Sequence, residues 1–293
     1  MAVEITCVAD LKCATGEGLF WDQEGQALWF VDIPVGELFR LKGEKLDRWN
    51  FGEPLGCLAI DREGHPVLAL KSGLVRMNLT TGTHEMLANP ESDRPGNRFN
   101  DGTVDRQGRF WLGTMKLGGP PERTGAFYRV DADRHVTRFF DQTYTTNGLA
   151  FSPDGRTLYL SDSNPEVRTI WACDYDVANG TPSNKRVFFD TRAVAGRPDG
   201  GTVDADGCYW MAGVGGWQLL RLTPKGTIDR IIDLPIERPT RPWFGGADLD
   251  VLYVTSIGAN MSAGTEARQP KAGGLFAITG TGVKGLAQPR FAG

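Results

Sequence analysis

The chain has 293 residues and a formal net charge of −4, from 32 basic and 36 acidic side chains. A hydrophobic share of 40% and a charged share of 23% exclude a globally disordered chain, and the mild, dispersed acidity argues against a nucleic-acid or membrane partner. No apolar run approaches the roughly 18 residues of a membrane span, and residues 1–12 lack the apolar stretch of a signal peptide.

Cysteine and histidine usage narrows the possible chemistry further. The five cysteines are scattered and never form a CxxC pair, which predicts reduced thiols in a cytoplasmic protein. The three histidines, at 65, 84 and 135, lie in turn-like segments, which argues against a Ser-His-Asp triad or a histidine-rich zinc site. Any catalysis would therefore depend on carboxylate and amide groups.

A turn-and-strand repeat runs through the whole chain. A four-residue turn ending in glycine occurs at 22–25, 61–64, 105–108, 152–155 and 204–207, and a degenerate copy occurs at 247–250. Each turn precedes an apolar strand, and the last turn positions are 39, 44, 47, 52 and 43 residues apart. Units of roughly 40–50 residues with about four short strands are typical of propeller blades.

We therefore predict an all-β fold, a single six-bladed β-propeller domain over residues 1–293 with four antiparallel strands per blade. A β-sandwich would not need six copies of one turn, and a TIM barrel needs eight helices that are missing from the pattern. Strand 4–9 is expected to pair beside 274–278 and so close the ring. Segments 90–98 and 118–124 are predicted to be loops at one mouth, and a closed ring with little exposed edge predicts a monomer.

Polar residues recur eight positions before the last residue of each turn. The six residues at this position are Glu17, Gly56, Asn100, Asn147, Asp199 and Pro242. If the strands that follow are innermost, the four polar side chains converge on the central channel, and two carboxylates with two amide oxygens suit a hard divalent cation. Asn-Gly and Asp-Gly pairs are also ordinary hairpin signals, so a purely structural role is the alternative. Glu17 is not a turn former, which favours the site.

Other polar and aromatic positions of the repeat have simpler interpretations. Arg98 lies two residues before Asn100, so both can point the same way and hold an oxygen-rich ligand, although a solvated surface arginine is the alternative. Four turn aspartates are predicted to cap hairpins, and the aromatic residues that follow the turns are predicted to fill the core between blades. The aspartates are Asp22, Asp61, Asp105 and Asp204, and the aromatic residues are Trp29, Trp111, Tyr159, Trp210 and Tyr253.

Several short motifs occur in order along the chain. They are TGEG (15–18), RFNDG (98–102), GTM (113–115), TNGL (146–149), SNKR (183–186), PDG (198–200) and FGG (244–246). As a set they resemble the senescence marker protein/gluconolactonase family, which includes regucalcin and bacterial sugar lactonases.

The resemblance implies a six-bladed propeller with one divalent metal, Ca²⁺, Zn²⁺, Mn²⁺, Mg²⁺ or Fe²⁺, in the channel. It implies that Glu17, Asn147 and Asp199 are metal ligands, that Arg98 and Asn100 contact the substrate, and that Asp199 is the general base. One departure is visible: some members carry an acidic residue after the GTM motif, whereas this chain reads Lys-Leu-Gly-Gly at 116–119.

The expected function is metal-dependent hydrolysis of a sugar lactone, an aldonolactone, to the aldonic acid, with that small molecule as the only partner. A phosphotriesterase-like hydrolase and a non-enzymatic calcium-binding regulatory protein are the main alternatives, because fold alone does not decide function. A protein-interaction scaffold would not need the polar set, and Arg98 and Asn100 beside that set favour an enzyme.

Overall fold

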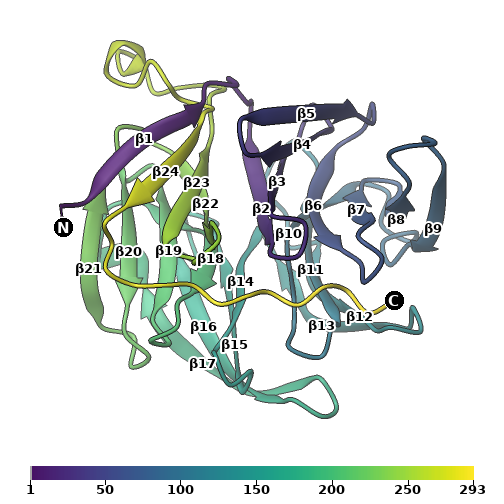
Figure 1. Ribbon diagram of the computed structural model, residues 1–293. Helices are drawn as coiled ribbons and strands as arrows, with labels where there is room; N and C mark the ends of the chain where they lie inside the picture. Colours follow the sequence, from purple (N-terminus) through teal and green to yellow (C-terminus); the bar gives the residue numbers. More distant parts are fainter. Residues whose placement is uncertain (1) are drawn as a thin grey trace.

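The structure, a computed structural model, describes residues 2–293 and consists almost entirely of β-strands (Figure 1). Twenty-four strands form six antiparallel sheets of four strands each, arranged as blades around a central channel. The helical segments of the described residues are two short 3-10 turns, η1 (Thr191–Ala193) and η2 (Glu266–Arg268), and neither is long or apolar enough to cross a membrane. The predicted six-bladed, all-β propeller is confirmed.

Blades 1 to 5 each use four consecutive strands. Blade 1 contains β2 (Gly16–Asp22), β3 (Ala27–Asp32), β4 (Glu37–Lys42) and β5 (Lys45–Asn50), and blade 2 contains β6 (Leu55–Ile60), β7 (Pro66–Leu70), β8 (Gly73–Met77) and β9 (His84–Ala88). Blade 3 contains β10 (Asn97–Val104), β11 (Phe110–Lys116), β12 (Gly125–Val130) and β13 (Val136–Thr143). Blade 4 contains β14 (Thr146–Phe151), β15 (Thr157–Asp162), β16 (Thr169–Asp176) and β17 (Thr181–Asp190), and blade 5 contains β18 (Arg197–Val203), β19 (Tyr209–Val214), β20 (Gln218–Leu222) and β21 (Ile228–Asp233).

Blade 6 joins the two ends of the chain. Its sheet order is β22 (Pro239–Gly245), β23 (Val251–Ser256), β24 (Leu275–Thr279) and β1 (Glu4–Ala9). β1 runs antiparallel to β24, with Glu4 opposite Thr279 and Ile5 opposite Ile278. The predicted closure by the N-terminal strand is therefore confirmed. It covers the edge that β24 would otherwise expose.

The first strand of each blade packs against the first strands of the two neighbouring blades and so lines the channel (Figure 1). All six of these strands carry a β-bulge at a corresponding place, where two residues stand opposite one residue of the second strand. The bulged residues are 18–19, 56–57, 100–101, 148–149, 199–200 and 240–241. A bulge re-aims the side chains beside it, and here it does so at the channel wall.

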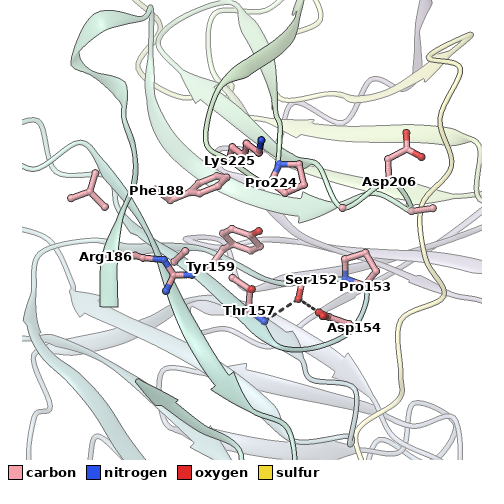
Figure 2. Close-up of a pocket in the computed structure, with 14 residues that line it drawn as sticks. Ser152, Pro153, Asp154, Thr157, Tyr159, Arg186, Phe188, Asp206, Pro224 and Lys225 are labelled. Carbon is pink, nitrogen blue, oxygen red and sulfur yellow. Dashed lines mark hydrogen bonds between the residues drawn. The ribbon is translucent and has the colours of Figure 1, made fainter. Parts of the chain in front are cut away.

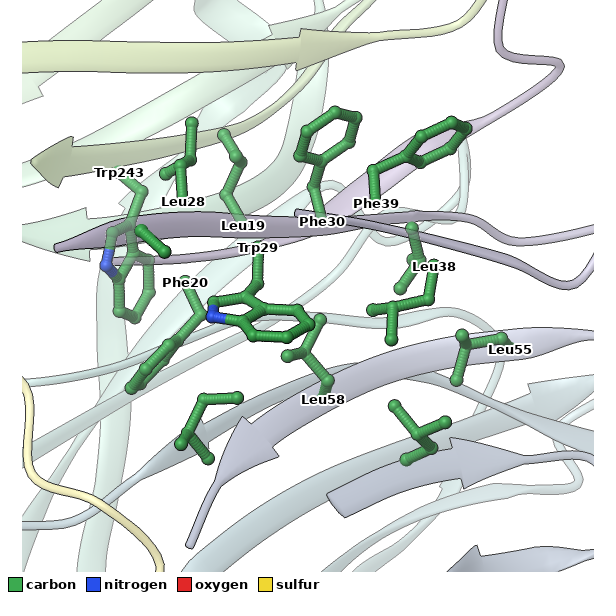
Figure 3. Close-up of a cluster of buried hydrophobic side chains, with 14 of the residues drawn as sticks. Leu19, Phe20, Leu28, Trp29, Phe30, Leu38, Phe39, Leu55, Leu58 and Trp243 are labelled. Atoms are coloured by element: carbon green, nitrogen blue, oxygen red, sulfur yellow. The ribbon is translucent and has the colours of Figure 1, made fainter. Parts of the chain in front are cut away.

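The apolar side chains pack between the blades. Figure 3 shows the cluster around blade 1, where Phe30 and Phe39 lie on one face of the sheet and Trp29 lies on the other, toward Leu58 of blade 2. The predicted packing of aromatic residues between blades is seen at Trp111 of blade 3, whose ring meets that of Tyr175 of blade 4 edge-on with centroids 5.8 Å apart. These contacts fix the blades relative to one another and thereby fix the channel wall.

The turn aspartates hold the hairpins between the first and second strands. Asp105 Oδ1 accepts the backbone N–H groups of Gln107 and Arg109, both at 2.9 Å, and Asp61 and Asp204 accept the equivalent pairs. The predicted capping role is confirmed for these three. It is wrong for Asp22, whose carboxylate instead binds the Arg290 guanidinium at 2.8 and 2.9 Å. The C-terminal tail supplies that arginine and thereby takes the carboxylate from the turn.

Residues 280–293 form a tail without regular structure that crosses the end of the propeller where these hairpins lie (Figure 1, yellow). The tail bonds to the hairpin backbones of several blades, with Phe291 N–H donating to Ile60 O at 2.8 Å and Ala292 N–H donating to Gly108 O at 2.9 Å. The tail does not cover the opposite end of the channel, where the first strands begin, and this end is called the open end below.

Candidate metal and substrate site

The four polar residues of the repeat lie at the open end of the channel, on the first strands of blades 1, 3, 4 and 5. Their heights differ by one ladder position. Glu17 and Asn147 are the last paired residues before the bulge, whereas Asn100 and Asp199 are the first residues within it. The position eight residues before the end of each turn predicted that all four side chains lie at one height along the channel. It misses the offset because those eight residues include both the turn and the bulge.

The repeat position carries no polar side chain in blades 2 and 6, where Gly56 and Pro242 stand, and the structure shows why. A Cβ atom on Gly56 would lie 2.4 Å from the backbone of Phe99, so only glycine fits where blades 2 and 3 meet. In blade 6 the bulge contains Thr240 and Arg241, and Pro242 is the first paired residue after it. The oxygen-bearing side chains are thus confined to blades 1, 3, 4 and 5.

The side chain of Asn147 is fixed by a hydrogen bond through its amide nitrogen alone. Its Nδ2 donates to Ser163 Oγ at 2.7 Å, and Ser163 Oγ in turn donates to the backbone oxygen of Pro198. This contact fixes the amide orientation and leaves Asn147 Oδ1 buried without a hydrogen-bond partner. A buried carbonyl oxygen without a partner is unfavourable unless a ligand occupies the space in front of it.

Glu17 and Asp199 are buried carboxylates that form no ion pair within 4.0 Å among the described residues. Burial raises the pKa of Glu17 well above its usual range, and the charges of Asp199 and Asp101 raise it further. Burial also raises the pKa of Asp199 to about 7, against the opposing charge of Arg197. The charge of Asp199 therefore disfavours ionisation of Glu17, and the charge of Asp101 disfavours ionisation of both, as expected where buried acids lie close together.

These groups fit a divalent cation. Two unpaired carboxylates and one unpartnered amide oxygen are hard oxygen donors, which suit Ca²⁺, Mg²⁺ or Mn²⁺ and also accept Zn²⁺. Among residues 2–293, no three acidic, histidine or cysteine side chains are placed so that they alone could hold a metal ion, so the third protein donor at this site would be the Asn147 amide.

Arg98 and Asn100 are held together beside this site. Arg98 Nη1 donates to Asn100 Oδ1 at 2.7 Å, and Asn100 Nδ2 donates to the backbone oxygen of Thr146 at 2.8 Å. The prediction that the two side chains point the same way is therefore confirmed. Burial lowers the pKa of Arg98 to about 10, against the charges of Glu17 and Asp199. The amide of Asn100 already has protein partners, so its place beside the cation site fits a substrate contact better than a metal ligand.

Sequence reasoning missed a buried ion pair across the channel. Arg241 of blade 6 binds Asp101 of blade 3, and both side chains are about 1% exposed. Asp101 also accepts the backbone N–H of Leu149 at 2.9 Å. The two residues occupy the same second position of their bulges on opposite blades, one step deeper than Asn100. The sequence does carry a signal for this pair, an acidic and a basic residue at equivalent positions of two blades. The equivalence is visible only once the positions of the bulges are known.

The two predicted mouth loops lie together, because Arg94 Nη1 and Asn97 Nδ2 both donate to Thr124 O, at 2.8 and 2.9 Å. The basic residue that departs from the family pattern, Lys116, is paired with Glu122 in this loop. Its charge is thus neutralised within the protein, and the loop presents no free ammonium group to the channel.

A cavity of about 710 Å³ lies away from this site. It lies between blades 4 and 5 and is lined by Tyr159, Arg186, Phe188 and Lys225, together with residues of the turns near Asp206 (Figure 2). These turns lie at the opposite end of the first strands from Asn147 and Asp199. None of the predicted site residues lines this cavity.

Comparisons with known proteins agree on one family. Residues 15–258 match the family described as "SMP-30/Gluconolactonase/LRE-like region". The chain is 38% identical to the 6-deoxy-6-sulfogluconolactonase of Pseudomonas putida, with 99% of each chain covered, and 36% identical to the regucalcin of Xenopus laevis, with 100% of this chain and 99% of the relative covered. A solved structure of regucalcin from Agrobacterium tumefaciens, described as a calcium-binding protein, superposes with a TM-score of 0.91 at 29% identity, covering 97% of this chain and 96% of that one.

Proposed function

This chain belongs to the SMP-30/gluconolactonase/LRE-like family, and on that premise we propose that it is a metal-dependent lactonase that opens a sugar lactone to the aldonic acid. The observation that carries the proposal is the set of Glu17, Asn147 and Asp199 at the open end of the channel: two buried carboxylates without an ion-pair partner, and a buried amide oxygen without a hydrogen bond. Relatives named for lactone hydrolysis and for calcium binding support the same assignment.

Glu17, Asn147 and Asp199 would hold the cation. When bound, a divalent cation supplies Lewis-acid polarisation of the lactone carbonyl and so favours attack by water. Ser163 would keep the Asn147 oxygen directed at the site through its 2.7 Å contact with the amide nitrogen.

Asp199 would act as the general base. It takes one proton from the attacking water as the new bond to the carbonyl carbon forms, and it returns that proton to the ring oxygen as the ring C–O bond breaks. The product is the open-chain aldonic acid, which releases a proton at neutral pH. Arg98 and Asn100 would hold the sugar hydroxyls, since their mutual 2.7 Å contact fixes both donors on one side of the channel.

The test is a comparison of reaction classes on the protein as isolated. Opening of 1,4- and 1,5-aldonolactones would be followed with a pH indicator slightly below neutral pH, where spontaneous hydrolysis is slow. Aryl phosphotriesters would be assayed in parallel. Faster opening of at least one aldonolactone than of any phosphotriester supports the proposal. The reverse order favours the phosphotriesterase alternative, and cation binding without either activity favours a calcium-binding regulatory protein.

A further inference from the structure

Two arginines lie at the starts of neighbouring channel strands, and the proposed reaction uses neither. Arg197 is the first residue of β18 and Arg238 immediately precedes β22, and these are neighbouring innermost strands of blades 5 and 6. The mouth hairpin of blade 5 packs onto this place, where the N–H groups of Gly215 and Trp217 donate to Glu237 O at 3.1 and 3.2 Å. Both arginine side chains are half-buried.

Neither guanidinium has an acidic partner within 4.0 Å in residues 2–293. Arg197 Nη1 donates to the backbone oxygen of Ser163 at 3.3 Å, and Arg238 Nη2 donates to the backbone oxygen of Ala259. The nearby acid, Glu237, instead accepts from Ser262 at 2.6 Å and from Gln269 at 3.4 Å.

Arg221 of blade 5 shows what a satisfied arginine looks like in this fold. Its guanidinium binds three carboxylates, those of Asp204, Asp206 and Asp229, each at 2.8 Å. Burying part of two neighbouring cations without any such partner is unfavourable, unless an anion from outside the protein joins them.

The pair lies next to the reacting groups. Arg197 is two residues from Asp199 on β18, and the backbone oxygen to which it donates belongs to Ser163, whose hydroxyl holds the Asn147 amide. Of the neighbouring charges, that of Arg197 has the largest effect on the pKa of Asp199, which it lowers. Burial lowers the pKa of Arg238, and the charge of Arg197 lowers it further, against the charge of Glu237.

Arg98 lies on blade 3 and Arg238 stands just before blade 6, and these two blades face each other across the channel. A bound divalent cation would offset the two negative charges of Glu17 and Asp199. The mouth would then present an excess of positive charge on the side away from Arg98. An oxyanion group is the ligand that two adjacent guanidinium groups recognise best.

Building on the proposed function, we propose that Arg197 and Arg238 form a subsite for an anionic substituent of the lactone, a carboxylate, sulfonate or phosphate group on the sugar. This subsite selects a charged sugar lactone over its neutral counterpart. It is separate from the loop that carries Lys116, whose charge is already paired with Glu122.

The experiment compares two substrates that differ only in this substituent, glucono-1,5-lactone and its 6-phosphate ester, in the metal-loaded protein. For the wild type we expect a kcat/KM about 10-fold or more higher for the phosphate ester, the value of one charge-assisted contact. Arg197→Gln and Arg238→Gln should each bring this ratio toward one. Arg138→Gln, a change of an exposed arginine on the outer strand of blade 3, should leave it unchanged. A wild-type ratio of one or below, or a ratio unaffected by both variants, would overturn the proposal.

Binding of the ring-opened products separates this inference from the proposed activity. Calorimetry would compare gluconate and 6-phosphogluconate on the same four proteins. If no lactone is opened, the proposed function fails, but tighter binding of 6-phosphogluconate that is lost in Arg197→Gln still supports the subsite. If neutral lactones are opened while both products bind equally well, the subsite fails and the lactonase proposal stands.

Discussion

The amide oxygen of Asn147 and the carboxylates of Glu17 and Asp199 are all buried with little compensation from the protein. Asn147 Oδ1 forms no hydrogen bond, Glu17 accepts the N–H of Gly18 at 2.8 Å, and neither carboxylate has a basic partner within 4.0 Å among residues 2–293. Burying polar groups without partners costs on the order of 1–3 kcal/mol each, and more for charges. Such groups are unfavourable in the metal-free protein and favourable as soon as a cation joins them. Affinity for a cation is therefore a direct consequence of how these three side chains are placed.

Asp199 is the residue on which the proposed chemistry depends most. Asp199→Asn keeps the size of the side chain but removes the base, so kcat for lactone opening should fall about 10²- to 10⁴-fold. Thermal unfolding of the variant would be measured beside the kinetics, because an intact transition separates a lost base from a lost fold. Turnover within a few-fold of the wild type would remove Asp199 from the mechanism.

The Asp101–Arg241 pair makes a different prediction, about stability. Arg241→Met leaves the Asp101 carboxylate buried without its cation, and the free energy of unfolding should fall by about 3–5 kcal/mol. The double variant Asp101→Leu/Arg241→Met removes both charges and should recover part of that loss. Denaturant unfolding of the two variants and the wild type checks this. A double variant less stable than Arg241→Met alone would contradict it.

Individual site residues were predictable to different degrees. Counting along the repeat finds four of them, because each lies in the first half of a strand that lines the channel: Glu17, Asn100, Asn147 and Asp199. Their roles as ligands, base and substrate contacts remain predictions. Ser163 could not be found in this way, since it lies just after the second strand of blade 4, 16 residues from Asn147 in the sequence, and only the folded sheet brings the two side chains into contact.

At the scale of strands and turns, the repeat is visible in the sequence because the same type of hairpin turn recurs. An aspartate caps the hairpin after the innermost strand and binds a side chain with its other oxygen, as Asp105 does with Tyr175 Oη at 2.6 Å. The bulges were not predictable, because a bulge adds a residue to one strand without any fixed residue type. The bulged positions include Gly18 and Gly148 with positive φ, but also Asn100 and Asp199.

The capping aspartates should therefore contribute more to the free energy of unfolding than exposed turn residues usually do. Asp105→Ala removes two turn contacts and leaves Tyr175 and Arg109 without their buried acceptor, so stability should fall by about 2–4 kcal/mol. Asp133→Ala serves as the matched control, because Asp133 is exposed and accepts only the N–H of His135. The control should lose no more than about 1 kcal/mol in the same denaturation experiment. Equal losses in the two variants would show that Asp105 acts only as a turn residue.

At the scale of the whole molecule, the ring is joined at two places. The pairing of β1 with β24 was predictable, since both segments read as strands at opposite ends of a repeat that needs a sixth blade. The tail from 280 to 293 was not, because it carries no periodic pattern. Its contacts with hairpins of several blades exist only once the ring has formed.

Phe291 anchors that tail. Its side chain is 0% exposed and packs against Phe110 with ring centroids 6.0 Å apart. Phe291→Ala should lower the free energy of unfolding by about 3 kcal/mol through the lost apolar contacts. Val187→Ala, at a side chain 64% exposed, should change it by no more than about 0.5 kcal/mol. A loss no larger than that of the control would mean that the tail only covers the channel end.

The central claim is that one cation, held by Glu17, Asn147 and Asp199, is required for lactone opening. The most direct measurement strips the protein of metal, adds back a divalent cation in steps, and records the rate of aldonolactone opening and the melting temperature on the same samples. We predict that the rate rises in proportion to added cation, levels off at one equivalent for a tightly bound ion, and is accompanied by a stabilisation of about 2.7 kcal/mol at 100 times Kd. An opening rate that is the same in stripped and cation-loaded protein would contradict the account.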